Sequence, residues 1–280
     1  MKKISRRSFL AASGLTIAAL ALTACGGSAS TASSAASSVA ASSEAVSTSA
    51  AAAELTTVEA GKLTMATNAA FPPYEMTTDA GAFEGIDIDT AQAIADKLGL
   101  ELQIDDMDFD AALLSVQQGK ADIVMAGVTV TDERKNVMDF SDSYATGIQS
   151  IIVPEGSDIT SPDDLAGKKI GTQRGTTGYI YCSDDFGDDA VVAYDDGLTA
   201  VQALNNGQVD AVVIDNAPAK EFVAANPGLV ILDTSYAEED YAIGMAKGNT
   251  ALEDAVNAAL EELKADGTLQ SIVDKYITAE

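Results

Sequence analysis

The chain has 280 residues, with 16 basic and 43 acidic side chains, a formal charge of −27 and no histidine. This length allows one large domain or two modest ones. A chain this acidic does not bind nucleic acid or an anionic membrane face through bulk charge. The absence of histidine also excludes histidine-dependent catalytic triads, histidine metal sites and a histidine pH switch.

The first 24 residues have the features of an export signal rather than of a folded segment. Arg6 and Arg7 form a twin-arginine pattern, and an apolar segment follows from Phe9 to Ala24. That segment is short for a membrane-spanning helix. We therefore predict a twin-arginine-like signal peptide over residues 1–24, although paired arginines also suit the general export route.

A cysteine stands at the end of the apolar segment. Leu22-Thr23-Ala24-Cys25 resembles a lipobox, the site at which bacterial lipoproteins are cleaved and lipidated on cysteine. We expect Cys25 to carry the lipid; the alternative is an ordinary signal peptide with an incidental cysteine. Cleavage there leaves 12 basic and 43 acidic residues, a formal charge of −31. The sequence thus predicts an extracytoplasmic bacterial protein held at the cell membrane by a lipid anchor only.

Residues 25–56 consist of the lipidated cysteine and a stretch made almost wholly of serine, alanine and threonine. Such a stretch has too little apolar bulk to fold, so we expect a flexible tether. An alanine-rich helix is the competing interpretation, and the interspersed serines and threonines disfavour it.

Once Cys25 is lipidated, Cys182 has no partner within the chain, so no intramolecular disulfide is expected. We expect Cys182 to be a small buried apolar residue. The alternating aspartates from Asp106 to Asp110 resemble the start of a calcium loop, but Ala111 occupies the position that requires glycine. We predict no metal ion and no cofactor.

From Gly61 onward, strand-like and helix-like segments alternate. The pattern predicts a strand at 62–67, an ordered loop at 71–74, a helix at 86–98 closed by Gly99, a strand at 100–104, a helix at 109–118 and a buried strand from 121. This β-α-β-α-β order is typical of a parallel sheet.

A long extended run at 144–153 separates this unit from a second one. The second unit is expected to contain a helix start at Ser161, strands at 169–172, 191–194, 209–214 and 229–232, and helices after 178, at 197–206 and up to 226. Another extended run, 241–246, precedes amphipathic helices at 252–264 and 268–276. We hypothesise that this run leads back to the first unit.

Polar residues stand at the predicted strand ends, where open α/β sheets bind ligands. They are Asn68, Gly127 with Thr129, the loop from Gln173 to Thr177, and Asp215. The fork of Arg134 and the amides at the helix start after Thr176 suit a carboxylate, whereas Asp215 suits an ammonium group. Both groups on one crevice would describe a free α-amino acid. The alternative is structural, with the threonines and Asp215 as helix caps.

Several stretches, taken together and in order, resemble a known family. They read TNAAFPPYE, GIDIDTAQAIADKLG, MDFDAALLSVQQGKADIVMAGVTVTDERK, DFSDSY, LAGKKIGTQRGTTG, VQALNNGQVDAVVIDN and DGTLQSIVDKY. From Gly61 to Tyr276, the chain resembles the extracytoplasmic solute-binding proteins (family 3) of polar amino acid ABC transporters.

The resemblance implies a periplasmic-binding-protein-like fold of type II. Each of its two lobes is an α/β unit, a mostly parallel sheet flanked by helices, and two hinge strands join the lobes. On this pattern lobe 1 comprises residues 57–146 and 242–280, and lobe 2 comprises 147–241. The hinges fall near 144–148 and 239–243.

The resemblance also implies a ligand-binding set: Asn68, Phe71, Tyr74, Phe109, Ala126, Gly127, Thr129, Arg134, Gln173, Thr176, Thr177 and Asp215. In this set Arg134 binds the ligand α-carboxylate, helped by Thr129 and Thr177. The carbonyl of Gly127 and the carboxylate of Asp215 meet the α-ammonium.

The resemblance further implies that Phe71 and Phe109 sandwich the ligand, with Tyr74 nearby. It places Asn68 and Gln173 toward the ligand side chain. Many relatives carry an acid where this chain has Asn68, so the ligand stays open between glutamine-like polar and Arg/Lys-like basic amino acids.

The favoured hypothesis is a monomeric, non-enzymatic binding protein that closes on an amino acid and delivers it to an ABC transporter permease. Two alternatives stay open: a dehydratase-like enzyme on the same fold, and an amino acid sensor without transport.

Overall fold

The computed structural model describes residues 55–277. The described residues all belong to one compact unit. The expected signal peptide, Cys25 and nearly all of the tether lie outside the described residues. Within the described part of the chain, no helix combines the length and the hydropathy needed to cross a membrane.

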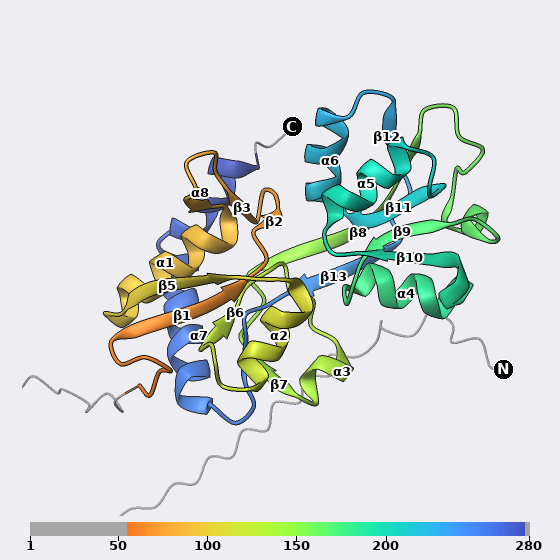
Figure 1. The fold of residues 1–280 in the computed structure, drawn as a ribbon. Helices are drawn as coiled ribbons and strands as arrows, with labels where there is room; N and C mark the ends of the chain where they lie inside the picture. Colours follow the sequence, from red (N-terminus) through yellow and green to blue (C-terminus); the bar gives the residue numbers. More distant parts are fainter. Residues whose placement is uncertain (1–54, 278–280) are drawn as a thin grey trace, which may run out of the picture. The chain divides into compact units, whose positions relative to one another are not determined.

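The first sheet has five strands in the order β5-β1-β6-β14-β7 (Figure 1). They are β1 (Lys62–Thr67), β5 (Glu101–Asp106), β6 (Ile123–Val124), β7 (Met138–Phe140) and β14 (Gly244–Ala246). β1 runs parallel to β5 and β6, whereas β14 is antiparallel to β6 and β7. The chain therefore returns to its first sheet after building the second, as the topology hypothesis predicted.

Alternating side chains of the first sheet face two different layers of helices, because successive residues of a strand point to opposite faces. Leu63 and Met65 join the core formed with α1 (Ile86–Leu98), α7 (Thr250–Ala265) and α8 (Thr268–Tyr276). Ala66 instead joins the core under α2 (Phe109–Gln117). As predicted, α1 ends at Gly99, which has φ 69° and is in the left-handed region that glycine tolerates.

The second sheet has the strand order β10-β9-β11-β8-β12, and β13 also pairs with β8. Its strands are β8 (Ala145–Pro154), β9 (Ile170–Gln173), β10 (Val191–Tyr194), β11 (Ala211–Asp215), β12 (Leu229–Ile231) and β13 (Ala237–Tyr241). The flanking helices are α4 (Thr177–Phe186), α5 (Gly197–Asn205) and α6 (Asn216–Ala225). β9, β10 and β11 are parallel, so their carboxyl ends reach one edge of the sheet.

Two strands lie side by side where the chain passes between the sheets. β8 and β13 run antiparallel side by side (Figure 1). In their register, Gln149 lies opposite Ala237 and Ala145 opposite Tyr241. The chain leaves the first sheet just before β8 and re-enters it at β14, just after β13. Both crossings lie close to the residues that the resemblance assigned to the hinges, near 144–148 and 239–243.

Short elements are where the structure departs from the sequence prediction. The helix expected from Ser161 is a single 3-10 turn, Pro162–Leu165, although the capping box of Ser161 and Asp164 is present. The extended run at 241–246 is divided, because β13 pairs with β8 and β14 pairs with the first sheet. A small sheet of β2 (Ala70–Phe71), β3 (Glu75–Thr77) and β4 (Phe83–Glu84) was not predicted, since strands of two or three residues leave no readable period.

Candidate functional site

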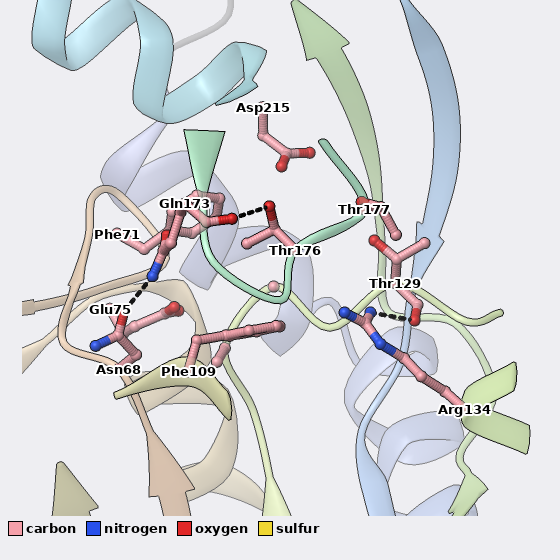
Figure 2. Close-up of a pocket in the computed structure, with 12 residues that line it drawn as sticks. Asn68, Phe71, Glu75, Phe109, Thr129, Arg134, Gln173, Thr176, Thr177 and Asp215 are labelled. Atoms are coloured by element: carbon pink, nitrogen blue, oxygen red, sulfur yellow. Dashed lines mark hydrogen bonds between the residues drawn. The ribbon is translucent and has the colours of Figure 1, made fainter. Parts of the chain in front are cut away.

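A pocket lies beyond the carboxyl ends of the parallel strands of both sheets, the position that α/β sheets favour for ligands. Its empty volume is about 320 Å³. Figure 2 shows its lining residues: Asn68, Phe71, Glu75, Phe109, Ala126, Gly127, Thr129, Arg134, Gln173, Thr176, Thr177 and Asp215. The structure thus brings together eleven of the twelve residues that the resemblance implied.

The remaining expected residue, Tyr74, does not line the pocket. Its ring stacks on Phe71 at a centroid distance of 5.8 Å and meets Tyr241 edge-on at 5.3 Å. Tyr74 therefore supports the aromatic wall from behind. Its neighbour Glu75 lines the pocket instead, a position that the sequence analysis did not single out.

Arg134 is a buried cation that faces the pocket. Thr131 caps the short helix α3 (Asp132–Lys135) by accepting the N–H of Arg134 at 3.2 Å. The guanidinium lies 5.4 Å from the centroid of the Phe109 ring, and burial lowers the pKa of Arg134. Its Nη1 donates to the carbonyl of Thr129 at 2.7 Å and its Nη2 to the carbonyl of Gly175 at 3.2 Å. A guanidinium has five N–H donors, so these two bonds leave capacity for a carboxylate.

Two hydrogen bonds join the two sheets' loops across the pocket. One is the bond from Arg134 to Gly175; another runs from Nε2 of Gln173 to Oδ1 of Asn68, at 2.8 Å. At Gly175, which has φ 74°, a Cβ atom would overlap the carboxylate of Asp110. Glycine therefore suits position 175 for two reasons: it tolerates the positive φ angle, and its lack of a side chain leaves room for Asp110.

Asp215 places a buried carboxylate at the end of β11. It occupies the N-cap position of α6, but its side chain makes no capping hydrogen bond, so the alternative of a helix cap is wrong. Oδ2 instead accepts Nε2 of Gln149 at 2.7 Å. Burial, helped by the negative charge of Glu239, raises the pKa of Asp215 to about 7. A carboxyl raised in this way is stabilised in its ionised form by a cation placed beside it.

Glu75 and Asp87 form a second buried acidic group on the other side of the pocket. Asp87 accepts the N–H of Gly127 at 3.0 Å and the hydroxyl of Tyr144 at 2.9 Å, and burial raises its pKa to about 6. Burial, with the charge of Asp87, raises the pKa of Glu75 well above the ordinary range. Glu75 is fully buried, and within the described residues no N–H group or cation reaches its carboxyl oxygens; the group with which it shares a hydrogen bond is the carboxyl of Asp87.

Gly127 has φ 53°, and a Cβ there would come within 2.9 Å of the Phe71 ring. A side chain at this position would push the aromatic wall away, which explains why the close turn after β6 carries glycine. The N–H of Gly127 is already used by Asp87, so the carbonyl is the backbone group that this residue can offer a ligand.

Glu239, on β13, is the second acid that the sequence analysis missed. It is buried, and its Oε2 accepts the hydroxyls of Thr129 at 3.1 Å and Thr177 at 3.0 Å. One signal was available in the sequence. In a strand, Glu239 shares a face with Tyr241 while Glu238 and Asp240 face the other way, so alternation singles out the middle acid.

Comparisons with known proteins agree with this architecture. A sequence model described as bacterial extracellular solute-binding proteins, family 3, matches residues 63–279. A probable histidine-binding protein of Neisseria gonorrhoeae is 32% identical over 276 residues, which are 96% of this chain and 95% of the relative.

Solved structures of an ancestral arginine-binding protein are similar over most of the chain. The form bound to arginine is 43% identical with a TM-score of 0.74, over 78% of this chain and 98% of its own. The form bound to glutamine is 42% identical with a TM-score of 0.75, over 79% of this chain and 100% of its own. At this identity the two-lobed fold carries over to the present chain.

Asp215→Asn should change how stability depends on pH. A carboxyl with a raised folded-state pKa costs stability as the pH rises from its ordinary pKa, 3.8, through about 7, because the unfolded chain ionises first. Between pH 5 and 8 the ligand-free wild type should lose roughly 2–3 kcal/mol more free energy of unfolding than the variant. Urea unfolding at both pH values measures this difference. Asp240→Asn, exposed on β13, is the control, and equal pH dependence in Asp215→Asn and wild type would contradict the assignment.

Proposed function

This chain belongs to the bacterial extracellular solute-binding proteins of family 3, and from that premise we propose that it captures a basic L-amino acid and delivers it to an ABC transporter permease. Arginine is the ligand that fits the site best. The proposal is supported by the charges that line the pocket and by relatives named for binding histidine and arginine.

The main support for a ligand with a basic side chain is the buried carboxyl of Glu75. Glu75 is a fully buried acid on the pocket wall, and among the described residues no cation or N–H group pairs with it; its neighbour is a second acid, Asp87. An ionised acid in such a place is costly unless a cation pairs with it. A guanidinium offers two parallel N–H donors that match a carboxylate, whereas a neutral amide offers no compensating charge.

The α-amino and α-carboxylate groups are assigned to the opposite part of the pocket. Arg134 takes the carboxylate, with the backbone N–H groups of Thr129 and Thr177. Asp215 and the carbonyl of Gly127 take the ammonium. Phe71 and Phe109 enclose the aliphatic stem of the ligand from two sides, with Asn68 and Gln173 beside them. These roles agree with those that the family resemblance implied.

The proposed mechanism is closure of the two lobes on the ligand, followed by recognition of the closed form by the permease. In this proposal lobe 1 comprises 57–146 and 242–280, lobe 2 comprises 147–241, and β8 and β13 form the hinge. The chain acts as a monomer and is not an enzyme, as is expected from relatives that are named binding proteins.

We also propose that the protein is tethered outside the cell by a lipid on Cys25. The support is the lipobox-like Leu22-Thr23-Ala24-Cys25 and the extracellular character of the family. Residues 25–56 then act as the spacer between the membrane and the folded unit.

A thermal-shift screen of the refolded, ligand-free protein against the common amino acids tests the ligand class. A ligand that binds only the folded state raises the melting temperature by mass action. We expect the largest shift with L-arginine, a smaller one with L-lysine, and little with glutamine. Glu75→Gln should weaken arginine binding about tenfold or more, the loss of one charge-assisted hydrogen bond, and leave glutamine binding nearly unchanged.

Glu84→Gln is the matched control, because Glu84 is an exposed glutamate on the neighbouring strand β4. A screen in which glutamine gives the largest shift, or an equal loss for both ligands in Glu75→Gln, would overturn the basic-ligand assignment. No shift with any amino acid would overturn the proposed function itself.

Metabolic labelling with radioactive palmitate tests the anchor. The wild-type protein should incorporate the label and sediment with membranes, whereas Cys25→Ser should be unlabelled and recovered in the soluble fraction. Cys182→Ser should behave as wild type, because Cys182 is buried within the folded unit. A labelled Cys25→Ser protein would place the lipid elsewhere.

A further inference from the structure

The carboxylate of Glu239 joins three parts of the molecule through one oxygen atom. Its Oε2 accepts the hydroxyl of Thr129, next to the first sheet, and the hydroxyl of Thr177, the first residue of α4 in the second lobe. The same atom accepts Nε2 of Gln149 from strand β8, at 3.1 Å. One oxygen therefore receives three donors, from both lobes and from the strand between them.

These bonds settle what the two threonine hydroxyls can do. A hydroxyl has one proton to donate, and an ionised carboxylate only accepts. Because Thr129 and Thr177 give their protons to Glu239, neither hydroxyl can also donate to a carboxylate ligand. The donors left for a ligand carboxylate are those of Arg134 and of the backbone N–H groups, while the hydroxyl oxygens keep their lone pairs.

The same bonds belong to a hydrogen-bond network that extends across the pocket. Arg134 donates to the carbonyl of Thr129 and to the carbonyl of Gly175, two residues before Thr177. Thr129 and Thr177 then meet at Glu239. This hydrogen-bond network contains residues of both lobes, so all of its bonds form only when the lobes hold the relative position seen here.

We propose that Glu239 is a positioning residue that holds Thr129 and Thr177 together in the closed arrangement and reserves Arg134 and the backbone N–H groups for the ligand carboxylate. The part concerning the ligand rests on the proposed function. The part concerning the closed arrangement does not, because the bonds form within the chain itself.

Glu239 is suited to this role by its place on β13. Glu238 and Asp240 on either side are exposed, whereas Glu239 is buried and its carboxylate accepts the hydroxyls of Thr129 and Thr177. Its strand pairs with β8 along Gly147 and Gln149, so the carboxylate is fixed to the connection between the lobes rather than to a loop. The carboxylate of Glu239 therefore contacts both the residues around the ligand site and the strands that join the lobes.

The test compares full-length Glu239→Gln with full-length Glu238→Gln, which removes a neighbouring exposed charge from the same strand. An amide can place its oxygen where Oε2 lies, but it carries no charge, so all three hydrogen bonds lose their charge assistance, and its NH2 group replaces Oε1. In ligand-free protein, hydrogen exchange should become faster in peptides covering 128–135 and 173–178 of Glu239→Gln, and stay at the wild-type rate in Glu238→Gln.

Binding of L-arginine provides the second readout. Glu239→Gln should raise Kd about 10-fold to 100-fold, mainly through faster dissociation, whereas Glu238→Gln should leave it unchanged. Thr177→Val should raise Kd by more than Thr177→Ser, which keeps the hydroxyl that donates to Glu239. The threonine pair keeps the test valid if Glu239→Gln fails to fold.

Wild-type exchange rates in ligand-free Glu239→Gln, or equal effects of Thr177→Val and Thr177→Ser, would overturn the proposal. Failure of the wild type to bind any amino acid would overturn the proposed function instead. In that case the exchange comparison still decides whether Glu239 holds the closed arrangement.

Discussion

The cleft buries more negative than positive charge, and the rest of the site depends on that imbalance. Glu75, Asp87, Asp215 and Glu239 are all buried, while Arg134 is the one buried basic side chain among the described residues. Burying carboxylates without partners is costly, and proteins relieve the cost by protonation or by a cation. The raised pKa values of Asp215, Asp87 and Glu75 reflect that cost. A ligand with two cationic groups and one carboxylate matches this distribution.

The fold places these charges by ordinary means. Parallel strands of two sheets end at one crevice, and the helices and loops that follow supply polar groups there. Two antiparallel strands, β8 and β13, join the lobes and carry Gln149 and Glu239 into the same space. Glycines at 127 and 175 let backbones approach where a side chain would strike Phe71 or Asp110. Strands and tight turns on both sides of the crevice thus position the buried charged side chains.

Much of this arrangement was predictable from the sequence, because its signals are local. The helix at 86–98 has a clear period and a glycine cap, and Arg134 follows a capping threonine after a buried strand. Glu75 and Glu239 were missed for a physical reason. Each lies in a short strand whose burial is decided by distant partners: Asp87 beside Glu75, and Thr129 and Thr177 around Glu239. Local pattern does not report such contacts, because Thr129 and Thr177 lie 110 and 62 residues from Glu239, and even Asp87 lies in a different element from Glu75.

The most direct measurement is calorimetric titration of the ligand-free protein with L-arginine near pH 7, in two buffers of different ionisation enthalpy. A cation placed beside Asp215 and Glu75 lowers their raised pKa values, so the complex holds fewer protons than the empty site. We predict release of about one proton per arginine bound, and an affinity that rises from pH 5 to 8. Arginine binding with no proton release and no pH dependence would contradict the central claim that buried acids select a cationic ligand.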